Sequence, residues 1–95
     1  MARLYKIDDE FHADLLAGDY ASFEAALAEI HRVAALPWDS EPNQAPCINW
    51  RNCGRLYQIV EYETSGPYWV EIREVPVMGI SHEGVVWKEG FGPPG

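Results

Sequence analysis

Ninety-five residues allow one domain with a single compact core, since a chain of this length buries only about two-thirds of its unfolded surface. Seven basic and fifteen acidic residues give a formal net charge of −8, which opposes binding to nucleic acid because that binding relies on many Lys and Arg contacts with phosphates. The apolar runs are too short to cross a bilayer and the first residues lack a secretory-signal pattern, so we expect a soluble cytoplasmic protein without membrane or nucleic-acid partners.

The N-terminal part of the chain contains one short predicted strand and one ambiguous segment. Residues 3–7, RLYKI, alternate between polar and apolar side chains, which indicates a strand. Residues 9–17 are consistent with a short helix between an Asp8 cap and a Gly18 stop, and this is the interpretation we favour. The alternative is an extended segment centred on Leu15.

The clearest element is an amphipathic helix over residues 22–36. Ser22 is a suitable N-cap, and Pro37 disfavours helical angles in the residue before it, which places the end at Leu36. The residues at the spacing of one helical face are Phe23, Leu27, Ile30 and Ala34, flanked by Ala26 and Val33. One apolar stripe on a helix requires a sheet or another helix beneath it.

The C-terminal half predicts two β-hairpins. Residues 55–63 and 68–74 are rich in aromatic and β-branched side chains and are separated by TSGP. In the second of these strands, alternation places Trp69 on the outer face and Tyr68, Val70 and Ile72 together on the other.

The second hairpin and the tail complete the chain. VMGI and VVWK flank SHEG, where Gly84 is able to close a tight turn. Residues 89–95, EGFGPPG, are predicted to fray. The segregation of helix and strands predicts one α+β domain over residues 1–95, in which the helix packs on an antiparallel sheet of four to five strands.

A long connector over residues 37–54 is the preferred location of function. Loops of this length in compact domains usually have a purpose or pack on themselves. The candidate contact residues combine aromatic surface, planar donors and short polar groups: Trp38, Asp39, Asn43, Trp50, Arg51 and Arg55. The competing interpretation is a lid, in which the tryptophans cover the core and the asparagines bond to local backbone.

Catalysis and metal binding receive less support from the sequence. Cys47 and Cys53 have five residues between them, wider than the gap within a typical zinc-ligand pair, and we expect both to be reduced thiols. A metal site would need His31 from the helix to join them. Arg51 and Arg55 flank Cys53 and would lower its pKa if they lay on the same side, but no motif of a cysteine enzyme surrounds either thiol.

The sequence therefore predicts a small acidic protein-interaction or regulatory module, without cofactor or catalysis, that contacts a protein partner through residues 37–55. An inhibitor or immunity-type protein that neutralises a basic partner is one version. The alternative is a small cysteine- or metal-dependent enzyme that uses Cys53 and Cys47 with a histidine. A homodimer formed through an exposed edge strand is a further alternative.

Overall fold

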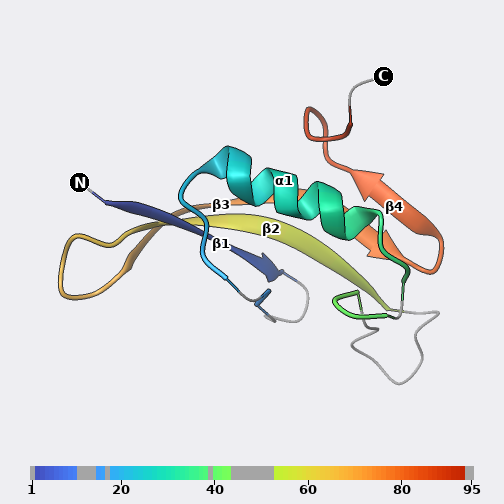
Figure 1. Cartoon of the computed structure of the whole chain (residues 1–95), viewed down its shortest axis with the longest axis horizontal. Helices are drawn as coiled ribbons and strands as arrows, with labels where there is room; N and C mark the ends of the chain where they lie inside the picture. The colour runs from blue at the N-terminus through green and yellow to red at the C-terminus, as the bar shows by residue number, and fades with distance from the viewer. Residues whose placement is uncertain (1, 11–14, 17, 39, 44–52, 94–95) are drawn as a thin grey trace.

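The computed structural model describes residues 2–10, 15–16, 18–38, 40–43 and 53–93, which form an α+β domain of one helix packed on a four-stranded antiparallel sheet (Figure 1). The elements are β1 (Arg3–Asp9), α1 (Phe23–Ala34), β2 (Gly54–Glu63), β3 (Val70–Ser81) and β4 (Gly84–Trp87). The strands lie in the order in which they occur in the chain, and each pairs antiparallel with the next. The predicted fold class is confirmed.

The helix begins as predicted and ends earlier. The Ser22 side-chain oxygen accepts the Ala25 backbone N–H at 3.0 Å, which satisfies one of the unpaired donors of the first turn. Ala26, Ile30 and Val33 form the fully buried stripe. The helix stops at Ala34 instead of Leu36, because the chain tightens there into a final turn in which each N–H bonds to the carbonyl three residues back.

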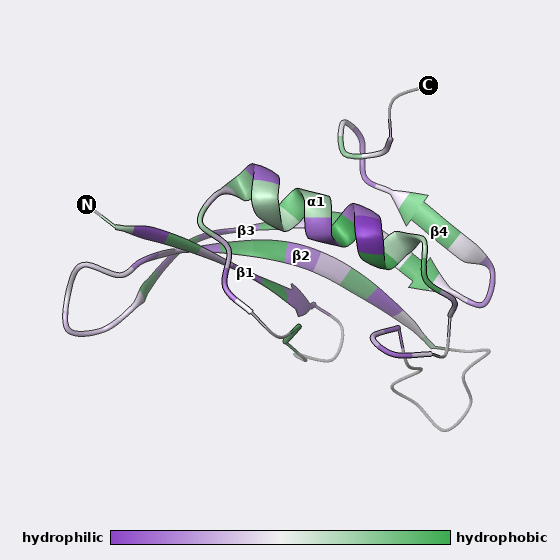
Figure 2. Cartoon of the chain, in the orientation of Figure 1, coloured by the Kyte–Doolittle hydropathy of each residue, from purple (hydrophilic) through white to green (hydrophobic). Residues whose placement is uncertain are grey.

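The core lies between α1 and the face of the sheet that the helix covers. Ile7, Ile59 and Val75 are directly opposite one another across β1, β2 and β3, so their side chains share that face. Ile7 and Ile59 are buried and Val75 packs against them. Hydrophobic and hydrophilic residues alternate along α1 and β2, as expected for elements with one buried side (Figure 2).

One long strand, β3, replaces two strands that the sequence predicted separately. Pro76 lies inside it, although proline removes a ladder hydrogen bond. Tyr57 pairs with Met78 while Gln58 pairs with Pro76, so Val77 is an extra residue in a β-bulge. A bulge accommodates proline, and the chain therefore continues from Val70 to Ser81 without a break. The hairpin from β3 to β4 is confirmed, with Gly84 at a φ of 114°.

The segment after β1 is extended where the structure describes it. Tyr5 and Tyr20 exchange two backbone hydrogen bonds of 2.8–2.9 Å, and the Leu16 N–H donates to the Ile7 carbonyl at 2.9 Å. The favoured prediction of a short helix is therefore wrong at Leu15 and Leu16, while residues 11–14 and 17 lie outside the described part. Pairing with the edge of β1 outweighed the local capping signals because it satisfies backbone groups of both segments.

The C-terminal tail also differs from its prediction. Phe91 packs on the core, with its ring centroid 5.9 Å from that of Phe23. A ring nitrogen of His31 lies 2.8 Å from the Phe91 carbonyl oxygen, and the His31 ring stacks on Trp87 at 4.4 Å. The tail is thus held against α1 as far as residue 91 instead of fraying from residue 89.

Candidate protein-interaction surface

Asn43, a predicted contact residue, is an interior residue that joins the loop to the helix and the sheet. Its side-chain N–H groups donate to the carbonyl of Val33, in the last turn of α1, at 2.9 Å and to that of Leu36, two residues past the helix, at 3.2 Å. Its amide oxygen accepts a hydrogen bond from the Tyr57 hydroxyl at 2.9 Å. Asn43 has no exposed surface. Both polar atoms of this amide therefore form hydrogen bonds within the protein, and neither is available to a partner.

Arg55 forms an ion pair at the start of β2. Its guanidinium Nη1 lies 3.2 Å from the carboxylate of Asp9, which is fully buried. The other carboxylate oxygen of Asp9 accepts the Leu56 backbone N–H at 3.0 Å. A buried charge is costly without such partners, so Arg55 has a structural task at the end of β1.

The remaining loop candidates divide between the core and the undescribed part of the chain. Trp38 is half-buried and packs against the hydrophobic core. Asp39, Trp50 and Arg51 lie outside the described residues. The described part of the loop therefore behaves as the lid that the sequence also allowed.

The described residues of the alternative metal or cysteine site make other contacts and do not form a common site. Cys53 is disulfide-bonded, so the expected reduced thiol is not found there, and Cys47 lies outside the described residues. His31 is occupied by Trp87 and the Phe91 carbonyl. In the part of the chain that the structure describes, no three His, Cys, Asp or Glu side chains are grouped so as to hold a metal ion.

An exposed apolar surface occurs instead where β2 turns into β3. We call it the hairpin strip; its exposed fractions are 81% for Tyr68, 48% for Trp69, 59% for Val70 and 44% for Ile72. Figure 1 shows this hairpin extending beyond the end of α1, so the helix does not cover it. Four large apolar side chains exposed within residues 68–72 of one hairpin are characteristic of a binding segment.

Sequence reasoning found only part of this strip. Trp69 was predicted to face outward, and it does: it contacts the Tyr62 ring at 5.7 Å between centroids, and the Lys6 ammonium lies 5.3 Å from its ring centroid. Tyr68, Val70 and Ile72 were predicted to share the opposite, buried face, but all three are exposed. A register shift leaves Ile72 without an opposite residue in β2, because Arg73 pairs with Glu61 and Glu71 with Tyr62. No local signal in the sequence shows where the helix stops covering the sheet.

The charges beside the hairpin strip are unevenly balanced. Arg73 is held by Glu61, with 2.7 Å between Arg73 Nε and the carboxylate, and this hydrogen bond is the main cause that lowers the pKa of Glu61. Glu71 and Glu74 instead interact with each other, and their hydrogen bond raises the pKa of Glu71. Neither has an ion-pair partner among the described residues. The strip is therefore bordered by uncompensated negative charge.

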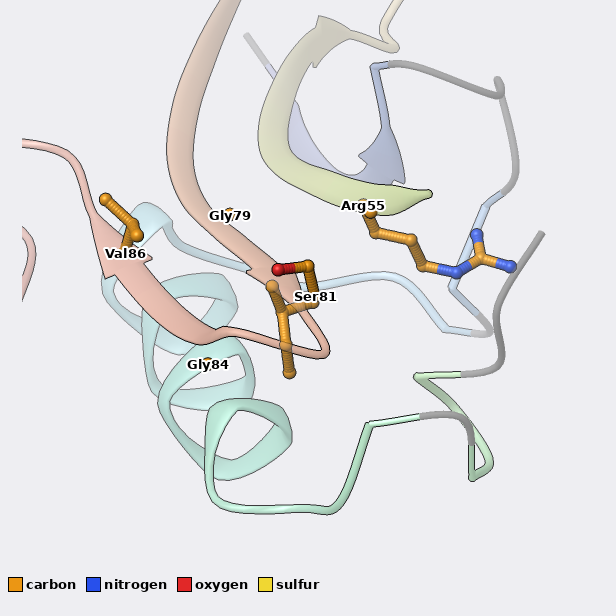
Figure 3. Close-up of a pocket in the computed structure, with 7 residues that line it drawn as sticks. Arg55, Gly79, Ser81, Gly84 and Val86 are labelled. Atoms are coloured by element: carbon orange, nitrogen blue, oxygen red, sulfur yellow. The ribbon is translucent and has the colours of Figure 1, made fainter. Parts of the chain in front are cut away.

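A second feature is a shallow hollow of about 190 Å³ near the turn from β3 to β4 (Figure 3). The residues that line it are Gly54, Arg55, Gly79, Ile80, Ser81, Gly84 and Val86. Gly79 contributes to this space because it has no side chain. A Cβ at this position would fit there, with its nearest neighbours 3.9 Å away. Figure 3 shows the Arg55 side chain leading away from Ser81 and Val86. With only the Ser81 hydroxyl to orient a ligand, the hollow lacks the convergent polar groups of a small-molecule site.

Comparisons with models of known protein families, with curated proteins and with solved structures gave no match. Among the described residues, no helix has the length and apolar character needed to cross a membrane. Within the part of the chain that the structure describes, the hairpin strip has the largest group of exposed apolar side chains close together in the sequence.

Proposed function

We propose that this protein is a small acidic, non-catalytic protein-interaction module whose hairpin strip contacts the partner. The observation that carries the proposal is the joint exposure of Tyr68, Trp69, Val70 and Ile72 at one end of the sheet. Aromatic side chains on a rigid scaffold are the usual anchors of protein interfaces. The net charge of −8 favours a basic partner, as for an inhibitor or immunity-type protein.

The loop over residues 37–55 stays in the proposal as a second contact. Its contribution would come from Asp39, Trp50 and Arg51. The burial of Asn43 and the ion pair of Arg55 support structural roles for those two residues.

Affinity capture with the purified, immobilised chain tests the proposal. The wild type is compared with Trp69→Ser/Ile72→Ser, with Trp50→Ala/Arg51→Ala, and with Val86→Ser, which changes an exposed apolar residue on β4 as a matched control. We expect a protein retained by the wild type and the control to lose at least about tenfold in affinity for the strip variant, a loss typical of interface anchors. Equal retention by all four proteins would refute the hairpin strip and the loop as contact surfaces.

The alternative, a cysteine- or metal-dependent enzyme, would require a different chemical state. Cys53 is able to act as a nucleophile or metal ligand only as a thiolate, so its disulfide would first have to be reduced. Metal analysis and thiol-alkylation rates of the reduced protein test this alternative directly. Absence of metal together with slow alkylation would eliminate it.

A further inference from the structure

β3, the strand that carries Val70 and Ile72 of the hairpin strip, is open along about half of its length. β4 pairs with β3 only from Met78 to Ser81, and one further backbone hydrogen bond, from the Lys88 N–H to the Val77 carbonyl, extends this contact. Over residues 70–76, β3 has β2 on one side and no described strand on the other. We call this stretch the open edge. Every second residue of such an edge directs its backbone N–H and C=O away from the sheet, where another strand is able to pair.

The two faces of the open edge have different chemistry. Glu71 and Glu74 pair with Tyr62 and Val60, whose side chains lie on the face away from α1. The opposite face carries Val75, which contacts the core, together with Arg73, whose charge Glu61 neutralises. A strand added here would therefore run beside acidic side chains on one face and beside apolar or neutralised side chains on the other.

Lys6, on β1, lies on the acidic face, but its ammonium pairs with Asp19 and lies over the Trp69 ring. Glu71 and Glu74 form no ion pair with a described residue. Asp8, across the sheet on β1, has a pKa raised first by burial and also by the charge of Glu74. Its Oδ1 atom and the Oε1 atom of buried Gln58 have no hydrogen-bond partner among the described residues. Negative charge on this face thus comes from Asp8 on β1 and from Glu71 and Glu74 on β3, which favours a positively charged neighbour.

The same charges disfavour a second copy of this chain at the open edge. Antiparallel pairing of two such edges would bring the glutamates of one copy against those of the other, and like charges on facing strands are destabilising. The bulge at Ile72 and the proline at residue 76 also interrupt a long regular pairing. A basic strand would replace this repulsion with attraction.

We infer that the open edge of β3 accepts an extended segment of the partner protein in which Lys or Arg alternates with apolar residues. The segment adds to the sheet beside β3, where backbone hydrogen bonds supply affinity and the alternating side chains supply specificity. Its basic residues face Glu71 and Glu74, and its apolar residues extend the surface of Val70 and Ile72. This inference rests on the proposed function and specifies the partner segment and the mode of binding.

The test uses the full chain and a capped synthetic peptide of alternating lysine and valine. Hydrogen exchange of the isotope-labelled protein is measured with and without the peptide. We expect the exchange of outward-facing amides within residues 70–76 to slow by at least about tenfold at saturation, because they gain hydrogen-bond partners. A peptide with N-methyl groups on one backbone edge should bind at least about tenfold more weakly, since it is unable to complete the ladder.

Matched charge variants separate strand addition from general attraction to an acidic protein. Glu71→Lys/Glu74→Lys should weaken peptide binding at least about tenfold. Glu83→Lys/Glu89→Lys, which produces the same net charge at two exposed positions beyond the open edge, should change it less than about threefold. A glutamate–valine peptide should not bind.

Four outcomes would overturn the inference: no binding of the lysine–valine peptide at millimolar concentration, protection outside the open edge, equal binding of the N-methylated peptide, or equal effects of the two double variants. Sedimentation that shows dimers broken by Glu71→Lys/Glu74→Lys would make a second copy the occupant and would also overturn it. The proposed function is judged separately, by capture with the Trp69→Ser/Ile72→Ser variant. Capture that depends on these side chains, with no protection of β3 amides by the captured partner, would retain the function and reject strand addition.

Discussion

The Tyr57 hydroxyl donates a hydrogen bond to the Asn43 amide oxygen across 2.9 Å, inside the core. The two residues come from a strand and from a loop that the sequence places in different elements. Because Asn43 also donates to the carbonyls of Val33, in α1, and Leu36, just past it, this one side chain links the helix and the sheet. It makes Asn43 part of the domain interior.

Replacement of Asn43 by alanine should lower the free energy of unfolding by about 2–3 kcal/mol, because it removes three hydrogen bonds of a buried amide, to the carbonyls of Val33 and Leu36 and from the Tyr57 hydroxyl. Urea denaturation followed by tryptophan fluorescence measures the change. Ser40→Ala, at an exposed position in the same loop, is the control and should change stability by less than about 0.5 kcal/mol. Equal effects of the two substitutions would contradict the role assigned to Asn43.

Stability should depend on Tyr57 at alkaline pH. Burial raises the pKa of Tyr57 from 10.0 to about 12. As pH rises, the unfolded chain releases the Tyr57 proton before the folded chain does. The contribution of protonated Tyr57 to the free energy of unfolding is therefore full below pH 10 and is lost as pH rises through about 12, with a slope of at most about 1.4 kcal/mol per pH unit. Unfolding free energies measured across this window should show the loss in the wild type and a smaller one in Tyr57→Phe. Identical pH profiles would argue against a buried, protonated Tyr57.

Ser22→Ala should destabilise the protein by about 1 kcal/mol, since it removes the oxygen that accepts the Ala25 N–H. Ser22→Asp restores an acceptor at the N-cap and should recover most of this loss. Thermal unfolding by circular dichroism distinguishes the three proteins. If Ser22→Asp is as unstable as Ser22→Ala, capping is not the cause.

Glu61→Gln should lower the free energy of unfolding slightly, and the difference from the wild type should disappear at acid pH and shrink at high salt concentration. The hydrogen bond from Arg73 is the main cause that lowers the pKa of Glu61, and the charges of Arg73 and Arg3 add to it. The contribution is therefore present above the ordinary glutamate pKa of about 4.3 and is lost as pH falls through the lowered value. We expect at most about 1 kcal/mol at neutral pH, reduced at 1 M salt, by urea denaturation. A salt-independent difference would indicate lost packing instead.

Iodoacetamide should modify Cys53 only after reduction, because this residue is disulfide-bonded. Peptide mapping by mass spectrometry before and after treatment with dithiothreitol checks the state of the thiol. Reduction should lower stability by about 2 kcal/mol, at the lower end of the usual contribution of a disulfide. Rapid labelling of untreated protein would revive the interpretation of Cys53 as a reactive thiol.

Local patterns were sufficient to predict the regular elements. The spacing of Phe23, Leu27 and Ile30 identified the helix, and Ser22 identified its start. Gly84 identified the tight turn from β3 to β4 because that turn needs a positive φ. These features depend on residues close together in the chain, so their physical causes are visible in the sequence.

Long-range pairing decided what the local patterns left open. Leu15 and Leu16 became extended because β1 offers them backbone partners, which outweighs the preference of the segment for a helix. Residues 68–74 and 77–80 joined into one strand because a bulge against β2 absorbs Pro76. Phe91, in the tail predicted to fray, packs on the core beside apolar side chains of α1 and β4.

The candidate site shows the same division. The sequence by itself determined that this is a small acidic α+β domain, since composition and periodicity express those properties directly. Only the tertiary structure decided which side chains stay exposed: Asn43 turned inward, and Val70 and Ile72 outward. The reason is that exposure depends on where a three-turn helix stops covering a longer sheet, and that boundary is set by packing between residues far apart in the chain.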